Sequence, residues 1–282
     1  MHTFDTNGVQ IVPLQSKQLV EDAKTTLESL YPLSNQDVAV HEFGNDGVGT
    51  FPTRYDALNR VGVSMELIGL AQRFLKTADV MLIQSVAWAK YASNTNNHDQ
   101  RMHMDYGNNS LGHPSDWSSP EVVAMILYYS DTSETGGGTA YVARESQDDE
   151  WYQPPYNRMP GQGSLPFAND KTQAERILNA HDIDRSSLYA REVRPRFHVG
   201  DVLVYRHDVW HRGTPVKPNQ VRYVHSLAYK KRECHWIYSW TNFASKMYYG
   251  HIEAFILTLN MRQLDVIGFP RSKHTQRYLA RL

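Results

Sequence analysis

The residues of this 282-residue chain that most directly suggest chemistry are His103 and Asp105, which are separated by a single methionine. In a β-strand, residues i and i+2 project from the same face, so this imidazole and this carboxylate can enter one cavity. Two ligands leave a metal ion under-coordinated, so a third must come from elsewhere in the fold. Two imidazoles and one carboxylate on one face of an ion leave positions open for other ligands, which is the facial triad of non-haem Fe(II) oxygenases.

His211 is the predicted third ligand, because it closes a strand-like stretch that begins at Asp201. Glycine, proline and asparagine follow at once and predict a turn, after which apolar and polar residues alternate again. A hairpin centred between Val216 and Lys217 would place His211 directly opposite Arg222, and cross-strand partners share a face. The guanidinium of Arg222 would then lie in the metal cavity, where its fork of donors suits a carboxylate.

These residues need a scaffold of strands and helices to hold them, and residue spacing along the chain predicts where these elements lie. Strands dominate from Val80 to Lys230, while residues 35–59 are rich in Gly, Asp and Asn and are predicted as loops. Apolar residues at helical spacing predict helices at both ends of the chain and one among the strands. The predicted helices are Lys17–Leu30 with Ser16 as its cap, a segment that begins at Ser64, Lys171–Ala180 and Trp240–Leu264.

This pattern predicts a mainly β fold with flanking helices, namely a double-stranded β-helix, also called a jelly-roll or cupin-like barrel. The length is within the range of one elaborated β domain, so we expect a single domain over residues 1–282. Its core would span about residues 80–230, with helices in residues 16–76 and 240–264 as buttresses.

The order of these motifs resembles that of the phytanoyl-CoA dioxygenase superfamily of Fe(II)- and 2-oxoglutarate-dependent oxygenases. The resemblance runs from Gln84 to Tyr229 and includes the strand Ala124–Asp131, the glycine run Gly136–Gly138 and the strand entry Gly200–Leu203. Two features depart from the family pattern. Met102 stands where many members have a tryptophan before the first ligand, and the Pro-Gly-Ser-His segment that often follows the glycine-rich strand is missing.

The resemblance implies that His103, Asp105 and His211 bind Fe(II) and that Arg222 binds the distal carboxylate of 2-oxoglutarate. Dioxygen would be the second cosubstrate, and succinate and carbon dioxide would be the co-products. The implied reaction is hydroxylation of an unactivated C–H bond of a small molecule or an acyl thioester. Because Asp105 is an acid rather than a small residue, the pattern argues against a halogenase of this family.

Other residues are weaker candidates for the same site. Thr139 and Thr214 are predicted to contact the cosubstrate, although a threonine after glycines is often only a strand former and one beside a ligand often only shapes a turn. Gln84, Tyr106 and Trp117 are candidates for the substrate pocket. The plainer alternatives are a glutamine at the mouth of the barrel and aromatic residues of the core.

Composition excludes several classes of protein. The net charge is −1 with both signs interspersed, so no basic surface indicates nucleic-acid binding. The single cysteine, Cys234, cannot form an internal disulfide, and no secretion leader opens the chain, so we expect a cytoplasmic protein. No apolar run approaches the roughly 18 residues of a membrane span. A small-molecule substrate, free or linked to coenzyme A or a carrier, is expected, and the oligomeric state is left open.

Two other functions compete with the oxygenase. One is a non-catalytic cupin-like protein that binds a metal or senses a ligand. The other is a Zn- or Mn-dependent cupin-type enzyme, which would not need the carboxylate clamp at Arg222. A visible absorption band on anaerobic addition of Fe(II) and 2-oxoglutarate would distinguish the oxygenase from both.

Overall fold

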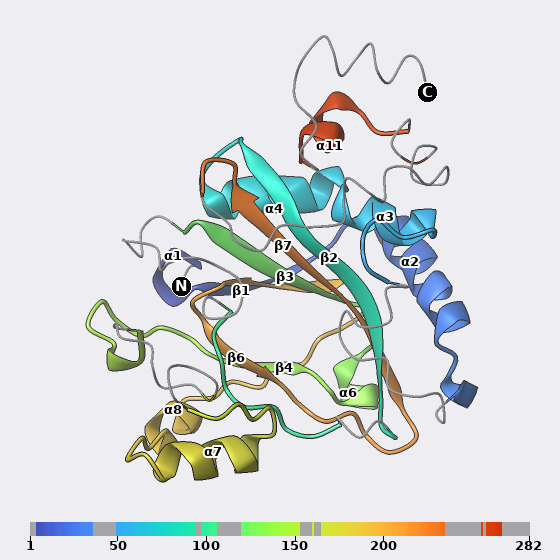
Figure 1. Cartoon of the computed structure of the whole chain (residues 1–282). Helices are drawn as coiled ribbons and strands as arrows, with labels where there is room; N and C mark the ends of the chain where they lie inside the picture. Colours follow the sequence, from blue (N-terminus) through green and yellow to red (C-terminus); the bar gives the residue numbers. More distant parts are fainter. Residues whose placement is uncertain are drawn as a thin grey trace.

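The computed structural model describes residues 4–35, 49–93, 97–105, 120–152, 160, 165–234, 255 and 258–266 of the chain. Helices and strands alternate along these ranges (Figure 1). The strands are β1 (Val9–Pro13), β2 (Val80–Tyr91), β3 (Val122–Tyr128), β4 (Thr139–Val142), β5 (Asp201–Arg206), β6 (Trp210–Gly213) and β7 (Val221–Lys231). The α-helices are α1 (Phe4–Asn7), α2 (Lys17–Leu30), α3 (Asp56–Gly62), α4 (Met65–Leu75), α6 (Thr132–Thr135), α7 (Lys171–Asn179), α8 (Ser186–Ala190) and α11 (Met261–Val266), and Leu33–Asn35 and Glu150–Tyr152 form short 3₁₀ turns.

The strands form two antiparallel sheets. Five of them pair in the order β1-β5-β3-β7-β2, and β4 pairs with β6. The predicted strand-rich region between Val80 and Lys230 is therefore confirmed, within a mixed α/β fold. Among the described strands, hydrogen bonding does not close the two sheets into a barrel.

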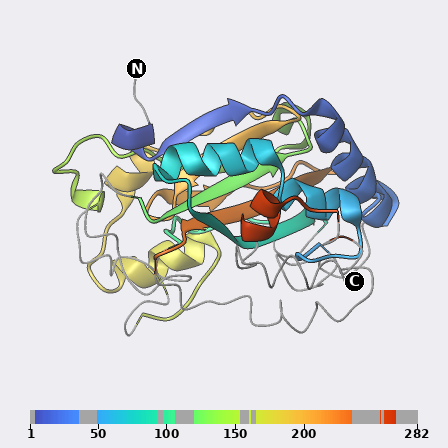
Figure 2. The same ribbon diagram turned by 90° about the horizontal axis from the view of Figure 1, so that it is seen from above.

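The larger sheet separates two apolar layers. Helices α2, α3 and α4 cover one of its faces, and the β4–β6 sheet lies on the other side (Figure 1). Figure 2, seen from above, shows α4 lying along the strands with α2 and α3 beside it. Because side chains alternate along a strand, β7 sends Tyr223 and Leu227 into the helix-side core and Val224 into the core between the sheets. Residues on the Val224 side of the sheet therefore face the β4–β6 sheet.

Most helix predictions near the N-terminus are confirmed. The predicted helix Lys17–Leu30 is α2, but the Ser16 hydroxyl donates to Glu66 Oε2 at 2.7 Å and makes no cap bond. Ser64 begins α4, and its Oγ accepts from the Leu67 amide at 3.3 Å, as an N-cap does. Helix α3 was not predicted, since its residues fall partly in the segment expected to be loop. None of the helices in the described ranges has the length and apolarity that a membrane span needs.

The two later helix predictions have different outcomes. The predicted helix Lys171–Ala180 is confirmed as α7, with Ala180 as its C-cap residue. The predicted continuous helix Trp240–Leu264 is wrong where the structure describes it, because the chain is not helical at 258–260 and α11 begins at Met261. The reason is a reciprocal cap, in which Asn260 Oδ1 accepts from the Gln263 amide at 2.9 Å and Gln263 Oε1 accepts from the Asn260 amide at 3.0 Å. Residues 240–254 lie outside the described residues.

Candidate metal centre

The segment that carries His103 and Asp105 runs alongside β6. His103 and His211 exchange two backbone hydrogen bonds, of 2.9 and 2.8 Å, and the Asp105 amide donates to the His207 carbonyl at 2.9 Å. Within His103–Asp105 only His103 forms an antiparallel bridge, and Asp105 lies in a bend, so the predicted strand is shorter than expected. This bridge places two of the predicted ligands side by side in the backbone.

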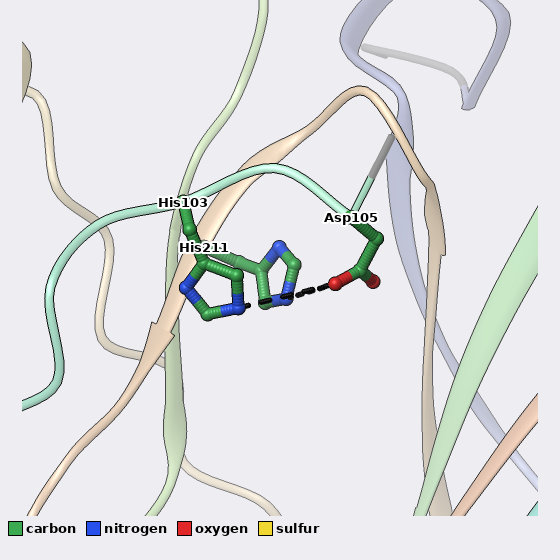
Figure 3. A group of neighbouring side chains, drawn as sticks. All are labelled: His103, Asp105 and His211. Atoms are coloured by element: carbon green, nitrogen blue, oxygen red, sulfur yellow. Dashed lines mark ion pairs between the residues drawn. The ribbon is translucent and has the colours of Figure 1, made fainter. Parts of the chain in front are cut away.

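The predicted triad comes together in space. Ligand atoms of His103, Asp105 and His211 all lie within 4.8 Å of one another. Asp105 Oδ1 is 3.9 Å from His103 Nε2 and 3.7 Å from His211 Nε2, and Figure 3 shows the three side chains pointing toward one another. In the part of the chain that the structure describes, this is the group of three such side chains that could hold a metal ion.

Both imidazoles are oriented by backbone carbonyls. His103 Nδ1 lies 3.1 Å from the Arg101 oxygen, and His211 Nδ1 lies 2.9 Å from the Val209 oxygen. Since a carbonyl only accepts, each Nδ1 carries a proton and each Nε2 presents its lone pair toward Asp105. Burial, followed by the charges of His211 and Arg101, lowers the pKa of His103 to about 3. The imidazole is therefore neutral at physiological pH, which is the form that binds metals.

Asp105 is held as a carboxylate by its neighbours. Tyr205 of β5 donates a hydrogen bond to Oδ2 at 3.3 Å, and its ring lies 4.6 Å from that of His211. Burial alone would raise the pKa of Asp105, but His211, His207 and His103, together with the Tyr205 hydrogen bond, lower it. Tyr205 belongs to the larger sheet and contacts both Asp105 and His211, which is in β6. The candidate metal centre therefore lies between the two sheets.

The predicted pairing of His211 with Arg222 is wrong. His211 pairs with Tyr141 of β4, whereas Arg222 pairs with Lys90 of β2. Residues 214–220 do not close a hairpin, because β6 and β7 belong to different sheets and this segment crosses from one to the other. His211 and Arg222 therefore reach the space between the sheets from opposite layers.

Arg222 is buried on the face of the larger sheet that looks toward the metal centre. Its side chain is 4% exposed, Nη1 donates to the Gly137 carbonyl, and the guanidinium lies 4.9 Å from the centre of the Trp88 ring. Within the described residues it forms no ion pair, and its buried Nε has no hydrogen-bond partner. Tyr128 lies on the same face, and it is close enough to Arg222 and to Tyr205 for Arg222 to lower the pKa of Tyr128 and for Tyr128 to raise that of Tyr205. Arg222 is therefore on the side of the sheet where Tyr205 meets Asp105.

Lys90 is a second cation beside Arg222. The two residues are cross-strand neighbours, and Lys90 Nζ donates to the Thr214 carbonyl at 3.1 Å. Burial, and then the charge of Arg222, lowers the pKa of Lys90 to about 7, while Asp99 opposes the shift. Lys90 is therefore about half protonated near pH 7, and a bound anion between it and Arg222 would favour its charged form.

The two predicted threonines lie at the same end of the β4–β6 sheet, where Thr139 pairs with Gly213, the residue before Thr214. Thr139 Oγ1 accepts from the Tyr128 hydroxyl at 2.8 Å, so its own hydroxyl proton is free to donate. Thr214 Oγ1 donates to the Gly138 carbonyl at 2.7 Å, so its proton is already used. Among the described residues, the hydroxyl proton of Thr214 thus has an acceptor and that of Thr139 has none.

Of the predicted pocket residues, Gln84 lies on β2 beside a register irregularity and is half-buried. It lies on the face directed at the β4–β6 sheet, which it shares with other half-buried side chains. These are Trp88, Ile126 and Ser226. Tyr106 and Trp117 lie outside the described residues.

Several residues of the site were not found from the sequence. Tyr205, Tyr128 and Lys90 reach it through strand pairing, and no local signal marks them among a chain with 17 tyrosines. Arg101 could have been found, since it stands two residues before His103 and the same alternation that joins His103 to Asp105 includes it.

No family model and no curated protein sequence matches the chain. Its structure is similar to the non-haem α-ketoglutarate-dependent carbocyclase SnoK from nogalamycin biosynthesis (14% identity, TM-score 0.55, 86% of this chain and 87% of that chain). It is also similar to the epimerase SnoN in complex with Fe³⁺, α-ketoglutarate and nogalamycin RO (14%, 0.54, 86% and 85%). A third similar structure is HygX from Streptomyces hygroscopicus with nickel and 2-oxoglutarate bound (15%, 0.50, 82% and 84%). The chain therefore has the fold of these proteins, which confirms the predicted resemblance at the level of the fold.

Proposed function

We propose that the protein is an Fe(II)- and 2-oxoglutarate-dependent oxygenase that hydroxylates an unactivated C–H bond of a small molecule. The observation that carries this proposal is the shared position of a three-ligand metal centre and a buried arginine. His103, Asp105 and His211 meet between the sheets, and Arg222 faces the same space from the larger sheet without a carboxylate partner among the described residues. We further propose that the two sheets are the halves of a double-stranded β-helix.

The donor set fits a catalytic divalent ion. Two neutral imidazoles and a carboxylate are the ligands that non-haem Fe(II) prefers, and three protein ligands leave other positions open. A structural zinc site would be closed by a fourth protein ligand, and the described residues supply none. Carbonyl-bound Nδ1 atoms on both histidines are the outer contacts that orient metal-binding imidazoles.

The surroundings of Arg222 fit the distal carboxylate of 2-oxoglutarate. Burying a guanidinium without a counter-ion is unfavourable, and a bidentate carboxylate would relieve this cost. Lys90 adds a second positive charge, and the free hydroxyl proton of Thr139 can donate to the same anion. Contact with Thr214 would require its bond to Gly138 to break, so we assign that residue to the shape of the site.

When bound, Fe(II) with 2-oxoglutarate supplies dioxygen activation, which yields succinate and carbon dioxide and oxidises a C–H bond. The chain's own residues bind and orient. Tyr205 holds Asp105, the carbonyls of Arg101 and Val209 aim the two imidazoles, and Arg222 fixes the far end of the cosubstrate. We propose that Gln84 contributes to the substrate pocket from the face of β2 that it shares with Trp88.

The competing functions are less well supported. A metal-binding protein without catalysis, or a Zn- or Mn-dependent cupin-type enzyme, gives no reason to bury Arg222 and Lys90 together beside the metal centre. A small-molecule substrate is favoured, since SnoN is described in complex with nogalamycin RO. A coenzyme A or carrier-linked acyl group gains no support from the similar structures.

The test is an anaerobic titration of the metal-free protein with Fe(II) and 2-oxoglutarate. We expect a weak visible charge-transfer band in the wild type that His211→Ala abolishes and that Arg222→Met shifts to higher cosubstrate concentration. His198→Ala is the matched control, because this exposed histidine pairs with Asp131 and is not a member of the triad. A wild-type protein that binds Fe(II) but shows no band with 2-oxoglutarate would refute the proposal.

A further inference from the structure

Six arginines are buried in the described part of the chain, and five of them fall into two groups, while the sixth, Arg144, donates to the Gln147 carbonyl. Arg185, Arg206 and Arg212 each hold a carboxylate, from Glu175, Asp208 and Glu192 respectively. Arg101 and Arg222 are equally buried, at 5% and 4% exposure, but neither forms an ion pair within the described residues. The proposed cosubstrate would supply a carboxylate to Arg222. No acid of the described residues forms an ion pair with Arg101.

The Arg101 guanidinium is enclosed and incompletely bonded. Its Nε and Nη1 atoms are buried and have no hydrogen-bond partner in the part of the chain that the structure describes. On one side it faces the ring of Phe167, whose centre is 5.0 Å away. Aromatic contact stabilises a cation but leaves its N–H donors unsatisfied.

The backbone of Arg101 is fixed beside the metal centre. Its amide donates to the Asn169 carbonyl at 2.7 Å, and its carbonyl is the partner of His103 Nδ1 at 3.1 Å. The side chain therefore starts from a residue that directly orients a metal ligand. An anion bound to Arg101 would lie within reach of the oxidation site.

The charges around Arg101 do not balance. Asp105 is the carboxylate that acts on it among the described residues, but one oxygen of Asp105 faces the two imidazoles and the other accepts from Tyr205. Arg185 lies close enough to repel Arg101, and its own charge is matched by Glu175. A bound metal ion would neutralise part of the negative charge of Asp105. The positive charge of the Arg101 guanidinium would then have no counter-ion among the described residues.

We propose that Arg101 binds an oxyanion, a carboxylate or a phosphate, carried by the substrate that is oxidised at the metal centre. This inference rests on the proposed oxygenase function. Arg101 contacts Phe167 and Asn169, near α7 and α8, whereas Arg222 contacts Gly137 and Trp88. The two arginines thus hold the two anions in different places, which leaves the cosubstrate and the substrate with separate anchors.

The test measures anion binding without turnover, in wild type, Arg101→Met and Arg101→Lys. The probes are inorganic phosphate and butyrate, titrated by calorimetry into the purified protein with Zn²⁺ in the metal centre and with 2-oxoglutarate present. We expect a saturable site for at least one probe in the wild type, with a Kd about tenfold or more weaker in Arg101→Met and partly restored in Arg101→Lys. Arg176→Met, an exposed residue on α7, is the matched control and should bind as wild type does.

Thermal unfolding without added anions separates a binding role from a structural one. Removal of an unpaired buried cation should leave the Tm of Arg101→Met equal to or above that of the wild type. A residue that only supports the fold would lower the Tm when it is removed. Phosphate binding without butyrate binding would assign a phosphorylated substrate, and the reverse would assign a carboxylic acid.

Two outcomes of the anion titrations would overturn the inference. They are the absence of saturable binding of either probe and probe binding that Arg101→Met leaves unchanged, and in the second case a lower Tm would assign Arg101 to the fold alone. The anaerobic titration with Fe(II) and 2-oxoglutarate is also repeated with Arg101→Met. If this variant needs more 2-oxoglutarate than the wild type to develop the visible band, Arg101 binds the cosubstrate and the inference is wrong.

If the oxygenase proposal itself fails, the wild type shows no visible band. The anion titrations still give a separate result in that case, because they measure binding without turnover.

Discussion

The Tyr205 hydroxyl donates to Asp105 Oδ2 across 3.3 Å, which leaves Oδ1 directed at the two imidazoles. Oδ2 therefore accepts a hydrogen bond from the protein, and Oδ1 remains available to a metal ion. Burial, together with the neighbouring charge of Asp105, raises the pKa of Tyr205 well above its ordinary value, so the hydroxyl keeps its proton and remains a donor. A residue of the larger sheet thus sets the orientation of a ligand that comes from a different segment.

We expect Tyr205→Phe to weaken metal binding about tenfold while the fold is kept. Loss of an outer contact to a metal ligand typically costs 10–100-fold in affinity, and here Asp105 would be free to rotate. Competition titration with a chromophoric chelator under anaerobic conditions gives the affinity, and circular dichroism checks the fold. An unchanged affinity would show that the imidazoles and the backbone position Asp105 by themselves.

Arg222→Met should raise the KM for 2-oxoglutarate by about 30-fold or more, because truncating one partner of a buried charge pair costs about 2–5 kcal/mol. Metal affinity should change little, since Arg222 touches no ligand of the triad among its described contacts. Succinate formation at varied cosubstrate concentration gives the KM, and Arg222→Lys should be intermediate. Equal loss of metal and cosubstrate binding would indicate instead that the site had collapsed.

Affinity for 2-oxoglutarate should fall as pH rises above about 7. In the folded protein the pKa of Lys90 is lowered from 10.5 to about 7 by burial and by Arg222, with Asp99 opposing. A bound carboxylate would favour the charged amine and raise this pKa, so binding above pH 7 takes up a proton and weakens by up to about tenfold per pH unit. The cosubstrate Kd, measured by calorimetry from pH 6.5 to 9, should lose this slope in Lys90→Met. A slope that persists in the variant would assign the proton to another group.

The same pKa shift predicts an effect of opposite sign on the stability of the protein without cosubstrate. Because Lys90 has a lower pKa folded than unfolded, the unfolded chain binds more protons between about pH 7 and 10.5, and stability gains with pH in that window. Urea unfolding at pH 7 and pH 9 measures this effect. The free energy of unfolding of the wild type should rise relative to that of Lys90→Met as pH increases.

Glu175→Gln should lower the free energy of unfolding by about 2–3 kcal/mol, since it removes the counter-ion of a buried arginine. Arg185 is 0% exposed and Glu175 20% exposed in this pair. Arg185 Nη1 also donates to the Met102 carbonyl at 2.8 Å, directly before His103, so metal affinity should fall as well. Urea denaturation measures the first effect, with Glu134→Gln as the exposed control. A change below about 0.5 kcal/mol would show that Tyr189 and backbone contacts suffice for Arg185.

Local periodicity was enough to identify much of this protein. The spacing of His103 and Asp105 placed both side chains in one cavity, because alternation along an extended chain is a property of the backbone alone. Helical spacing identified α2 and α7 in the same way. His211 joins His103 and Asp105 in space, as predicted for the third ligand, even though the hairpin used to place it does not exist.

The tertiary structure decided what lies around the ligands. Whether residues 214–220 turn back or cross to the other sheet depends on which strand edges are free to pair, and that is settled by the packing of the whole chain. The crossing gives His211 the partner Tyr141 and gives Arg222 the partner Lys90, and strand pairing brings Tyr205 to Asp105. Charge balance has the same origin, because only the folded chain shows that Arg185 has an acid beside it and that Arg101 and Arg222 have none in the described ranges.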